Sequence, residues 1–304
     1  MKNNTVLISL MVMAAIILAA CEGSAPTGGK ASTPTTAQTS APKDLLSEIQ
    51  SRGYMLVEVL MYTPTGQRPA TTKCPSDALT TSQLGGFDRD VAAEIGKRLG
   101  VETCFVTPDW STVPAGNWGD KWDVSIASMT ITNSRAKVLA FTVPYYYDYA
   151  VVVVKKGSGI NSLSDLNGKA MCVNSATTFE EWLNGKLDLP AADVFAQPPA
   201  NVKEVPVGSA QYCREVPGFG TDFIAYVFDS ADVDKDITNG APIVKLGGPV
   251  FRESLAAAVD KSSSLPTDSF VAELNKIITA MHSDGTLTKL SIQDNGADLT
   301  QPLK

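Results

Sequence analysis

The sequence predicts an α/β fold with mainly parallel sheets. Strand-like runs rich in β-branched residues alternate with helix-like runs from residue 55 to residue 281. The chain has 304 residues, which is long enough for a large core divided over two lobes or domains. Its 44% hydrophobic and 19% charged residues are ordinary for a globular protein.

The spacing of apolar residues gives the expected strands and helices. Runs with the composition of strands cover residues 55–62, 101–107, 122–128, 149–156, 168–174 and 222–229. Helices are expected at residues 87–100, 134–141, 177–185 and 270–281. The first helix places Phe87, Val91 and Ile95 on one face and stops at Gly100.

The charge balance limits the partners of the chain. Lys and Arg total 25 and Asp and Glu total 32, so the net charge is −7. A general nucleic-acid binder carries a basic face, and this composition argues against such a partner. A small anionic or zwitterionic ligand stays compatible with the composition, because a local site can differ in sign from the whole surface.

The N-terminus has the features of a secretory signal. Lys2 is followed by an apolar run from Val6 to Ala20, whose 15 residues are fewer than the ~20 of a membrane span. The run ends in "LAAC", which resembles a bacterial lipobox with Cys21 as the lipidated first residue of the mature protein. Two or more acyl chains would form a stable anchor. The alternative is a signal peptide, residues 1–20, that precedes a cysteine by chance.

Residues 21–43 are expected to form the lipidated cysteine and a disordered tether. Between residues 22 and 42 the chain is mostly Ser, Thr, Ala, Gly and Pro, with almost no large apolar side chain that could form a core. A tether of about 21 residues has a root-mean-square reach of about 25 Å. The folded part is expected to begin near Asp44.

Four further cysteines, Cys74, Cys104, Cys172 and Cys213, would lie in an oxidising compartment, where an even count indicates disulfides. They allow three pairings, and four separate buried thiols are the alternative. If the chain forms two lobes, a Cys74–Cys104 bond would lie in one and a Cys172–Cys213 bond in the other. No metal site is expected, because the chain has no CxxC motif and its one histidine, His282, is interpreted as a solvated residue at a helix end.

The stretch "SMTITNSR", which starts at Ser128, is a candidate anion site. It follows the third expected strand, and ligands of open α/β sheets lie at the carboxyl ends of strands. Ser128 and Thr130 would share one side of an extended segment, and Arg135 would lie in the first turn of the next helix. An arginine fork matches a carboxylate. A helix capped by Thr132, with a solvated Arg135, explains the same residues equally well.

Five stretches follow one another in a recognisable order: "GGFDRDVAAEIGKRLG", "WDVSIASMTITNSR", "FTVPYYYDYAVVVVKKG", "INSLSDLNGKAMCVNSATT" and "MHSDGTLTKL". This series closely resembles the family 3 extracellular solute-binding proteins, the amino-acid receptors of ABC importers. The resemblance runs from about residue 50 to about residue 292. It rests on the ordered set, because no single stretch is specific, and the lipobox and tether fit it as well.

The resemblance implies the type II periplasmic-binding-protein fold, in which two α/β lobes are joined by two crossover strands. The crossovers would fall near residues 150–153 and 252–255. Lobe 1 would comprise residues 44–151 and 254–304, and lobe 2 residues 152–253. Each of the two disulfides would then lie within a single lobe.

The resemblance also implies an amino-acid site between the lobes. The hydroxyls of Ser128 and Thr130 and the guanidinium of Arg135 would hold the α-carboxylate of the ligand. Asp229 would bind its α-ammonium, with Asp232 as the alternative. The residues expected to bind the ligand are Ser128, Thr130, Arg135, Trp110, Thr177, Thr178, Asp229 and Tyr62.

Several of these assignments have a purely structural alternative. Thr177 and Thr178 could only cap a helix, and Trp110 could be an ordinary core residue. The run "PYYY", residues 144–147, is expected to pack the hinge rather than to contact the ligand. These alternatives stay open on the sequence.

The ligand class is narrowed by the segment after the first strand. Family members for basic amino acids often carry an acid there, where this chain has Leu60 and Met61. We therefore expect a polar uncharged or acidic amino acid in preference to a basic one. Arg68 would favour an acidic side chain if it pointed inward, although a loop arginine is more often solvated.

The expected function is that of the substrate-binding component of an ABC importer, which delivers an amino acid to a membrane permease. The chain would be a lipid-anchored, extracytoplasmic monomer without cofactor, metal or catalytic residues. One alternative is a secreted cyclohexadienyl-dehydratase-like enzyme on the same fold, which needs a general acid or base in the cleft. Another is an amino-acid sensor domain that acts with a separate partner.

Overall fold

The structure is a computed structural model that describes residues 43–60, 66–208 and 211–301. The predicted signal peptide, Cys21 and nearly all of the tether lie outside these residues. Within them, no helix is long and apolar enough to cross a membrane. The folded part begins where the sequence predicted, because the side chain of Asp44 accepts a hydrogen bond from Ser47 N and caps the first helix.

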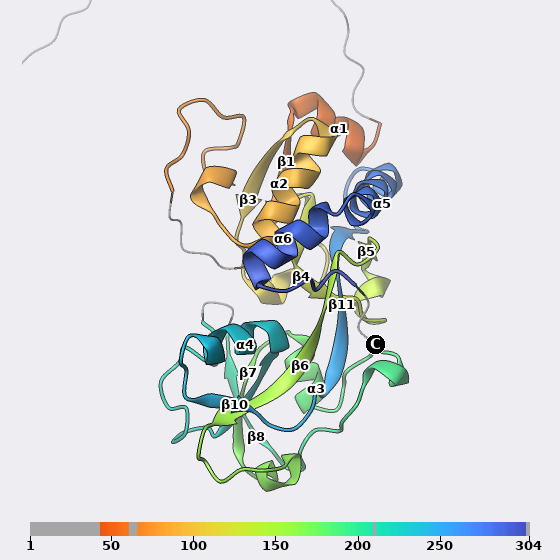
Figure 1. The fold of residues 1–304 in the computed structure, drawn as a ribbon. Helices are drawn as coiled ribbons and strands as arrows, with labels where there is room; N and C mark the ends of the chain where they lie inside the picture. The colour runs from red at the N-terminus through yellow and green to blue at the C-terminus, as the bar shows by residue number, and fades with distance from the viewer. Residues whose placement is uncertain (1–42, 61–65, 209–210, 302–304) are drawn as a thin grey trace, which may run out of the picture. The chain divides into compact units, whose positions relative to one another are not determined.

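The described strands form one twisted sheet (Figure 1). Its order is β2 (Leu79–Thr80), β3 (Glu102–Val106), β1 (Tyr54–Glu58), β4 (Val124–Thr130), β11 (Phe251–Asp260), β6 (Tyr146–Lys155), β9 (Ala225–Asp229), β7 (Ala170–Asn174) and β8 (Lys203–Val207). Two short strands lie off this path: β5 (Leu139–Phe141) pairs with β11, and β10 (Ile243–Lys245) pairs with β6.

The sheet is mixed, which corrects the expectation of mainly parallel strands. Parallel pairing is limited to β1 with β3 and β4, and to β7 with β8 and β9. The long strands β6 and β11 run antiparallel to each other and to their other neighbours. Their directions differ because the chain crosses the molecule along β6 and returns along β11.

Six α-helices flank the described strands: α1 (Leu45–Arg52), α2 (Phe87–Leu99), α3 (Thr178–Leu183), α4 (Ser230–Thr238), α5 (Asp268–Ser283) and α6 (Thr286–Asn295). Short 3-10 helices cover Thr81–Gln83, Trp110–Thr112, Arg135–Lys137, Leu163–Leu166 and Ala191–Asp193. The helix predicted at residues 87–100 is α2, which ends at Gly100 in the left-handed conformation that glycine adopts without strain.

Buried apolar side chains form two main cores. The first core gathers side chains of α1, α2, α5, β1, β3 and β4, and the second those of α3, β7 and β9. Strand β6 begins in the first core and ends in the second, and β11 runs the opposite way. On this basis we propose the lobe division predicted from the sequence, with residues 44–151 and 254–304 in one lobe and residues 152–253 in the other.

Both predicted disulfides are confirmed. Cys74 is bonded to Cys104, with 5.4 Å between the Cα atoms, and Cys172 is bonded to Cys213, with 5.7 Å. The second bond is buried in the second core. The first lies in a small separate cluster with Ala78, packed against side chains of β1 and β3.

The helix predicted at residues 134–141 is wrong. Only Arg135–Lys137 forms a single 3-10 turn, and the chain then continues as β5. The apolar residues that suggested a helical face instead belong to a strand, because Phe141 pairs with Ala258 of β11. Long-range strand pairing therefore overrides the local pattern.

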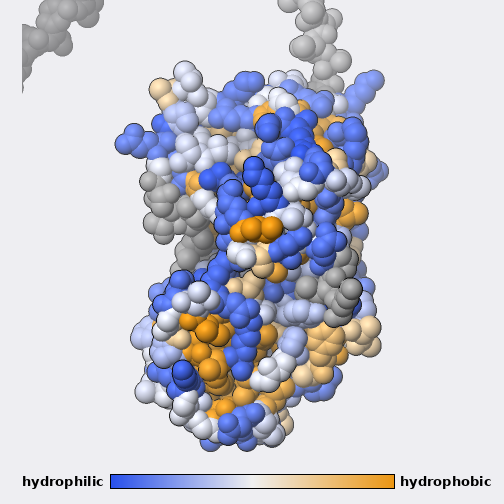
Figure 2. Space-filling model, in the orientation of Figure 1, coloured by the Kyte–Doolittle hydropathy of each residue, from blue (hydrophilic) through white to orange (hydrophobic). Residues whose placement is uncertain are grey.

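The surface is uneven in polarity. Figure 2 shows hydrophilic side chains over much of the face near α1 and α2, and hydrophobic side chains gathered near β10. Ile237 of α4 and Val244 of β10 are among the exposed large apolar residues there, with 38% and 37% of their surface accessible.

Candidate functional site

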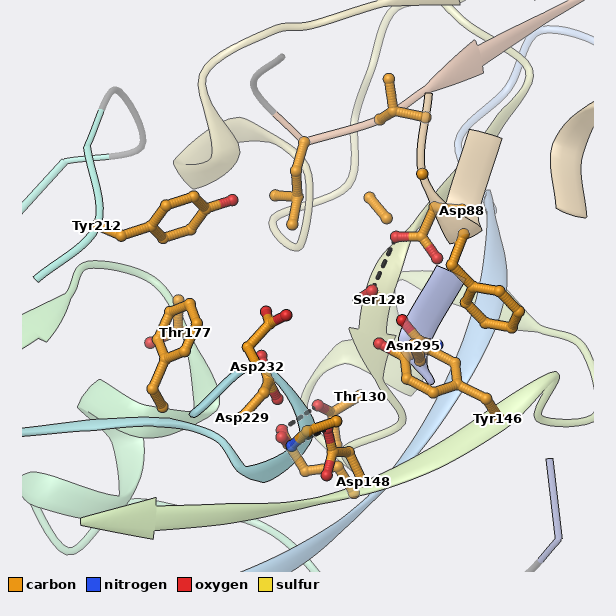
Figure 3. Close-up of a pocket in the computed structure, with 18 of the residues that line it drawn as sticks. Asp88, Ser128, Thr130, Tyr146, Asp148, Thr177, Tyr212, Asp229, Asp232 and Asn295 are labelled. Atoms are coloured by element: carbon orange, nitrogen blue, oxygen red, sulfur yellow. Dashed lines mark hydrogen bonds between the residues drawn. The ribbon is translucent and has the colours of Figure 1, made fainter. Parts of the chain in front are cut away.

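A cavity of about 340 Å³ lies where the two cores meet. It is bordered by the segment after β1, the start of α2, β4, β6, the β7–α3 connection, the β9–α4 junction and β11. Figure 3 shows side chains from these separate elements pointing toward a shared space. The ends of several strands therefore converge on one site, as in other open α/β sheets.

Seven of the eight residues expected to bind the ligand line this cavity: Ser128, Thr130, Arg135, Trp110, Thr177, Thr178 and Asp229. Asp232, the alternative to Asp229, also lines it. Tyr62 lies outside the described residues. Arg68 turns back onto its own loop and donates hydrogen bonds to the carbonyl oxygens of Cys74 and Ala78.

Ser128 belongs to a local hydrogen-bond network at one wall of the cavity. Its Oγ donates to a carboxylate oxygen of Asp88 at 2.7 Å, and its N–H donates to the hydroxyl of Tyr145 at 3.0 Å. Tyr145 in turn donates to the other oxygen of Asp88 at 2.7 Å. Burial raises the pKa of Asp88 to about 6, and both hydrogen bonds act against this increase.

The hydroxyls of Thr130 and Thr178 contact a carboxylate of the protein itself. Thr130 and Thr178 both donate to Oε1 of Glu253, the latter at 2.7 Å. Glu253 has 2% of its surface exposed, and its Oε2 has no hydrogen-bond donor among the described residues apart from a bond shared with the side chain of Asp229. The two threonines thus orient Glu253 at the cavity wall, a role that the sequence did not predict.

Arg135 is buried, with 4% of its surface exposed. Its Nη1 donates to the carbonyl oxygen of Thr130 at 3.1 Å and its Nη2 to that of Ala176 at 3.3 Å, while Nε has no partner in the described part of the chain. Burial lowers its pKa, but an arginine keeps its charge at neutral pH. Arg135 thus places a buried positive charge at the site, and its Nε–H can still donate a hydrogen bond to a ligand.

The surroundings of Arg135 differ from the prediction in one respect. Its backbone N–H donates to Oγ1 of Thr132 at 3.2 Å, so Thr132 contacts the start of the turn, although Ser134 and not Thr132 holds the N-cap position. The turn that follows is only three residues long, so no extended helix lies behind it. Attraction of an anion at this position must therefore come from the guanidinium and not from a helix dipole.

Trp110 connects a small apolar cluster beside the first core with the β7–α3 connection. Its Nε1 donates at 3.1 Å to the carbonyl oxygen of Ala176, the same oxygen that Arg135 contacts. Trp110 belongs to a smaller cluster beside the first core, whereas Ala176 lies in the β7–α3 connection. Ala176 has a positive φ of 62°, which an alanine rarely adopts and which sets the direction of this carbonyl.

Thr177 caps helix α3, which is the purely structural role that the sequence left open for it. Its side chain accepts a hydrogen bond from Glu180 N at 3.3 Å and donates to the carbonyl oxygen of Asn174 at 2.6 Å. This bonding does not remove Thr177 from the cavity wall (Figure 3).

The sequence missed several residues that line the cavity. Asp148, Glu253 and Tyr212 come from β6, β11 and the loop next to Cys213. Asp148 lies within the stretch "FTVPYYYDYAVVVVKKG" but was given no role, whereas Glu253 and Tyr212 lie outside all five stretches. The ring of Tyr212 packs edge-on against Phe228, with 5.4 Å between centroids. Figure 3 shows its hydroxyl directed into the cavity.

Two further features can be placed in the structure. In the run "PYYY", Tyr145 and Tyr146 are buried in the first core at the start of β6, as expected for a segment that packs the hinge, and Tyr146 also lines the cavity. His282 is half-buried, and its Nε2 lies 2.8 Å from the carbonyl oxygen of Pro144. It therefore fastens α5 to the segment before β6 instead of standing in solvent.

The chain belongs to the bacterial extracellular solute-binding proteins, family 3, whose model matches residues 70–293. It is an amino-acid-binding component of an ABC transporter and has the mixed α/β periplasmic-binding-protein fold. The family also places it outside the cytoplasm, as an extracellular or periplasmic protein.

Individual relatives support this membership. The L-cystine-binding protein TcyJ of Escherichia coli K12 is 27% identical over 263 residues, which cover 86% of this chain and 90% of that protein. The arginine-bound form of a truncated ArgBP from T. maritima is 25% identical, with a TM-score of 0.56 over 77% of this chain and 99% of that one. The ancestral amino acid-binding protein AncCDT-1, a precursor of cyclohexadienyl dehydratase, is 26% identical, with a TM-score of 0.62 over 82% and 99%.

The relatives also decide between a binding protein and an enzyme. TcyJ of Escherichia coli and PatH of Vibrio harveyi are named as binding proteins, and this chain is likewise a binding protein and not an enzyme. The dehydratase activity that the sequence left as an alternative therefore does not describe this chain.

Proposed function

We propose that the chain binds one free amino acid in the cavity between its two cores and delivers it to an ABC permease. The observation that supports this most directly is the buried Arg135, which lines the cavity and keeps an unpartnered Nε. A carboxylate is the natural partner of such a guanidinium. Asp229 lines the same cavity and is our candidate for the α-ammonium.

We further propose that Cys21 is lipidated and that residues 21–43 tether the folded part to the bacterial cell membrane. The "LAAC" sequence and the Ser-, Thr- and Pro-rich composition after it support this anchor. A tethered monomer could capture its ligand close to the permease, because the root-mean-square reach of the tether is roughly 25 Å.

A thermal-shift screen with the 20 standard amino acids and cystine tests the binding function. A ligand that binds only the folded state adds about 2.7 kcal/mol at 100 times its Kd, so a true ligand gives an increase in Tm that grows with concentration. The Arg135→Ala variant is expected to abolish this increase. If no amino acid in the panel stabilises the chain, the proposed function is wrong.

The control for Arg135→Ala is Lys137→Ala. Lys137 is exposed and lies in the same 3-10 turn, so its removal changes the net charge equally without reaching the cavity. Circular dichroism of both variants without ligand shows whether they are folded. A folded Arg135→Ala variant that binds with full affinity would contradict the role of the guanidinium.

A further inference from the structure

One wall of the cavity holds an unusual group of carboxylates, from Asp148, Asp229, Asp232 and Glu253. Glu253 stands directly opposite Asp148 in the antiparallel pair of β11 and β6. Asp229 stands opposite Ala150, two residues further along β6. Figure 3 shows Asp148, Asp229 and Asp232 on the same side of the site. Like charges that face each other across a strand pair are destabilising, so this group calls for a positive partner.

The basic side chains at the cavity leave most of this charge uncompensated. Arg89 pairs with Asp90, which lies outside the group. Lys235 lies 3.7 Å from Asp232 and also donates to the side chain of Asn295. Arg135 donates to two backbone carbonyl oxygens. Of the four carboxylates, only Asp232 forms an ion pair with a lysine or arginine among the described residues, and the charge of Glu253 also acts on Arg135.

Glu253 provides an acceptor in this wall. Two threonine hydroxyls hold its Oε1, and only 2% of the residue is exposed. Apart from a hydrogen bond shared with the side chain of Asp229, its Oε2 has no donor among the described residues. An unpaired buried carboxylate oxygen costs stability unless a ligand supplies a donor. Burial raises the pKa of Asp148 to about 7 and the pKa of Asp229 well above its ordinary value, and nearby Glu253 adds to both increases.

Asp148 accepts hydrogen bonds from the backbone N–H groups of Tyr149 and Ala231, and two threonine hydroxyls hold Glu253, but neither carboxylate forms an ion pair within the described residues. A single α-ammonium on Asp229 would leave both without a positively charged partner. A metal ion is not indicated, since no group of acidic, histidine or cysteine residues in the described ranges could hold one. We propose that the ligand carries a second cationic group, a guanidinium or a primary amine, which contacts Glu253 and Asp148. This inference rests on the proposed amino-acid function, and it reverses the sequence-based preference for an uncharged or acidic ligand.

Calorimetry of the purified chain with matched ligands tests the inference. Arginine is compared with citrulline, which has nearly the same shape without the charge, and lysine is compared with norleucine. A hydrogen bond to a charged group contributes about 1.5–3 kcal/mol, so the cationic member of at least one pair should bind about 10- to 100-fold more tightly. Equal binding of both members in each pair would show that protons neutralise the acidic wall and would overturn the inference.

Two variants test which carboxylates contact the second cationic group of the ligand. Glu253→Gln should reduce the affinity for the cationic ligand about tenfold or more and change the affinity for its uncharged analogue far less. Asp148→Asn serves as a second variant if Glu253→Gln does not fold. The control is Asp284→Asn, which removes the same charge at an exposed helix end.

The outcomes separate this inference from the function on which it rests. Tighter binding of glutamate, glutamine or serine than of arginine and lysine would overturn the inference and leave amino-acid binding intact. Absence of binding by every amino acid in the panel would overturn both. A loss of discrimination in Glu253→Gln, with no loss in Asp284→Asn, would support the assignment of Glu253 and Asp148.

Discussion

At the scale of single residues, Glu58 is an ionisable group that the proposed binding function does not use. Glu58 is the last residue of β1, and 1% of its surface is exposed. Neither of its carboxylate oxygens accepts a hydrogen bond at normal distance from the described residues. Burial raises its pKa from 4.5 to about 8, with Ser125 acting against the increase and Asp88 adding to it. Glu58 is therefore protonated at neutral pH in the folded chain, whereas in the unfolded chain it is ionised.

This difference makes stability depend on pH. Below about pH 4 the residue is protonated in both states and has no effect, and as pH rises the unfolded state loses its proton first. The free energy of unfolding should therefore fall between about pH 5 and pH 8, by about 3 kcal/mol at pH 7.

Glu58→Gln should remove most of this decrease in urea titrations at pH 5, 6, 7 and 8. Glu215→Gln, at an exposed carboxylate, is the control. Parallel pH profiles of wild type and Glu58→Gln would disprove the argument.

At the same scale, some residues of the candidate site could be predicted from the sequence and others could not. The sequence identified Ser128, Thr130 and Arg135 because a strand followed by hydroxyls and an arginine is a local pattern. It missed Glu253, which is 123 residues away from its partner Thr130. Contacts of this kind depend on which strands become neighbours, and periodicity along the chain carries no information about that.

At the scale of elements, local signals were sufficient where a segment satisfies its own hydrogen bonds. The helix at 87–100 was predictable because its apolar face and its terminal Gly100 are both local. The segment 134–141 was not, because β5 gains its hydrogen bonds from β11, over 110 residues later. The directions of β6 and β11 were likewise decided by the crossing between cores and not by strand composition.

The disulfide between β7 and the segment that connects β8 with β9 also has a consequence for the site. Cys172 and Cys213 are separated by 41 residues, and Cys213 stands next to Tyr212 in the cavity wall. Arg214 follows Cys213 in the sequence, and its guanidinium lies 5.3 Å from the centroid of the Tyr212 ring. The bond therefore fixes the segment that directs Tyr212 into the cavity.

Replacement of both cysteines by alanine, Cys172→Ala with Cys213→Ala, should lower the free energy of unfolding by about 4 kcal/mol in the chain-entropy model. It should also weaken ligand binding, because Tyr212 gains freedom that binding must remove. The matched control is Cys74→Ala with Cys104→Ala, whose bond spans 30 residues and does not border the cavity. This control should lose similar stability in urea but keep its affinity in calorimetry. An equal loss of affinity in both double variants would refute the link to Tyr212.

At the scale of the whole folded part, few hydrogen bonds outside the strands connect the first-core side with the second. Trp110 and Arg135 both donate to the carbonyl oxygen of Ala176, and Asn133 bonds to Asp188 through its backbone and its side chain. Lys235 of α4 also donates to the side chain of Asn295 in α6, and both of these residues line the cavity, as do Trp110 and Arg135. These contacts are small in number and exposed at one end, so they can break without disturbing either core, and we expect them to form when the cavity closes around a ligand.

Trp110→Phe tests this expectation, since phenylalanine keeps an aromatic ring but lacks the Nε1–H donor. One hydrogen bond contributes about 0.5–1.5 kcal/mol, so ligand affinity should fall about 3- to 10-fold while the Tm without ligand changes little. Small-angle scattering should give a larger radius of gyration for this variant than for the wild type at subsaturating ligand, because a smaller fraction of the molecules is closed.

Trp182→Phe is the matched control. Trp182 donates from Nε1 to the carbonyl oxygen of Ala196 within the second core, so the loss of this hydrogen bond should lower the Tm and leave the affinity unchanged. If the two substitutions have the same effect on affinity, the bond between Trp110 and Ala176 does not contribute to closure.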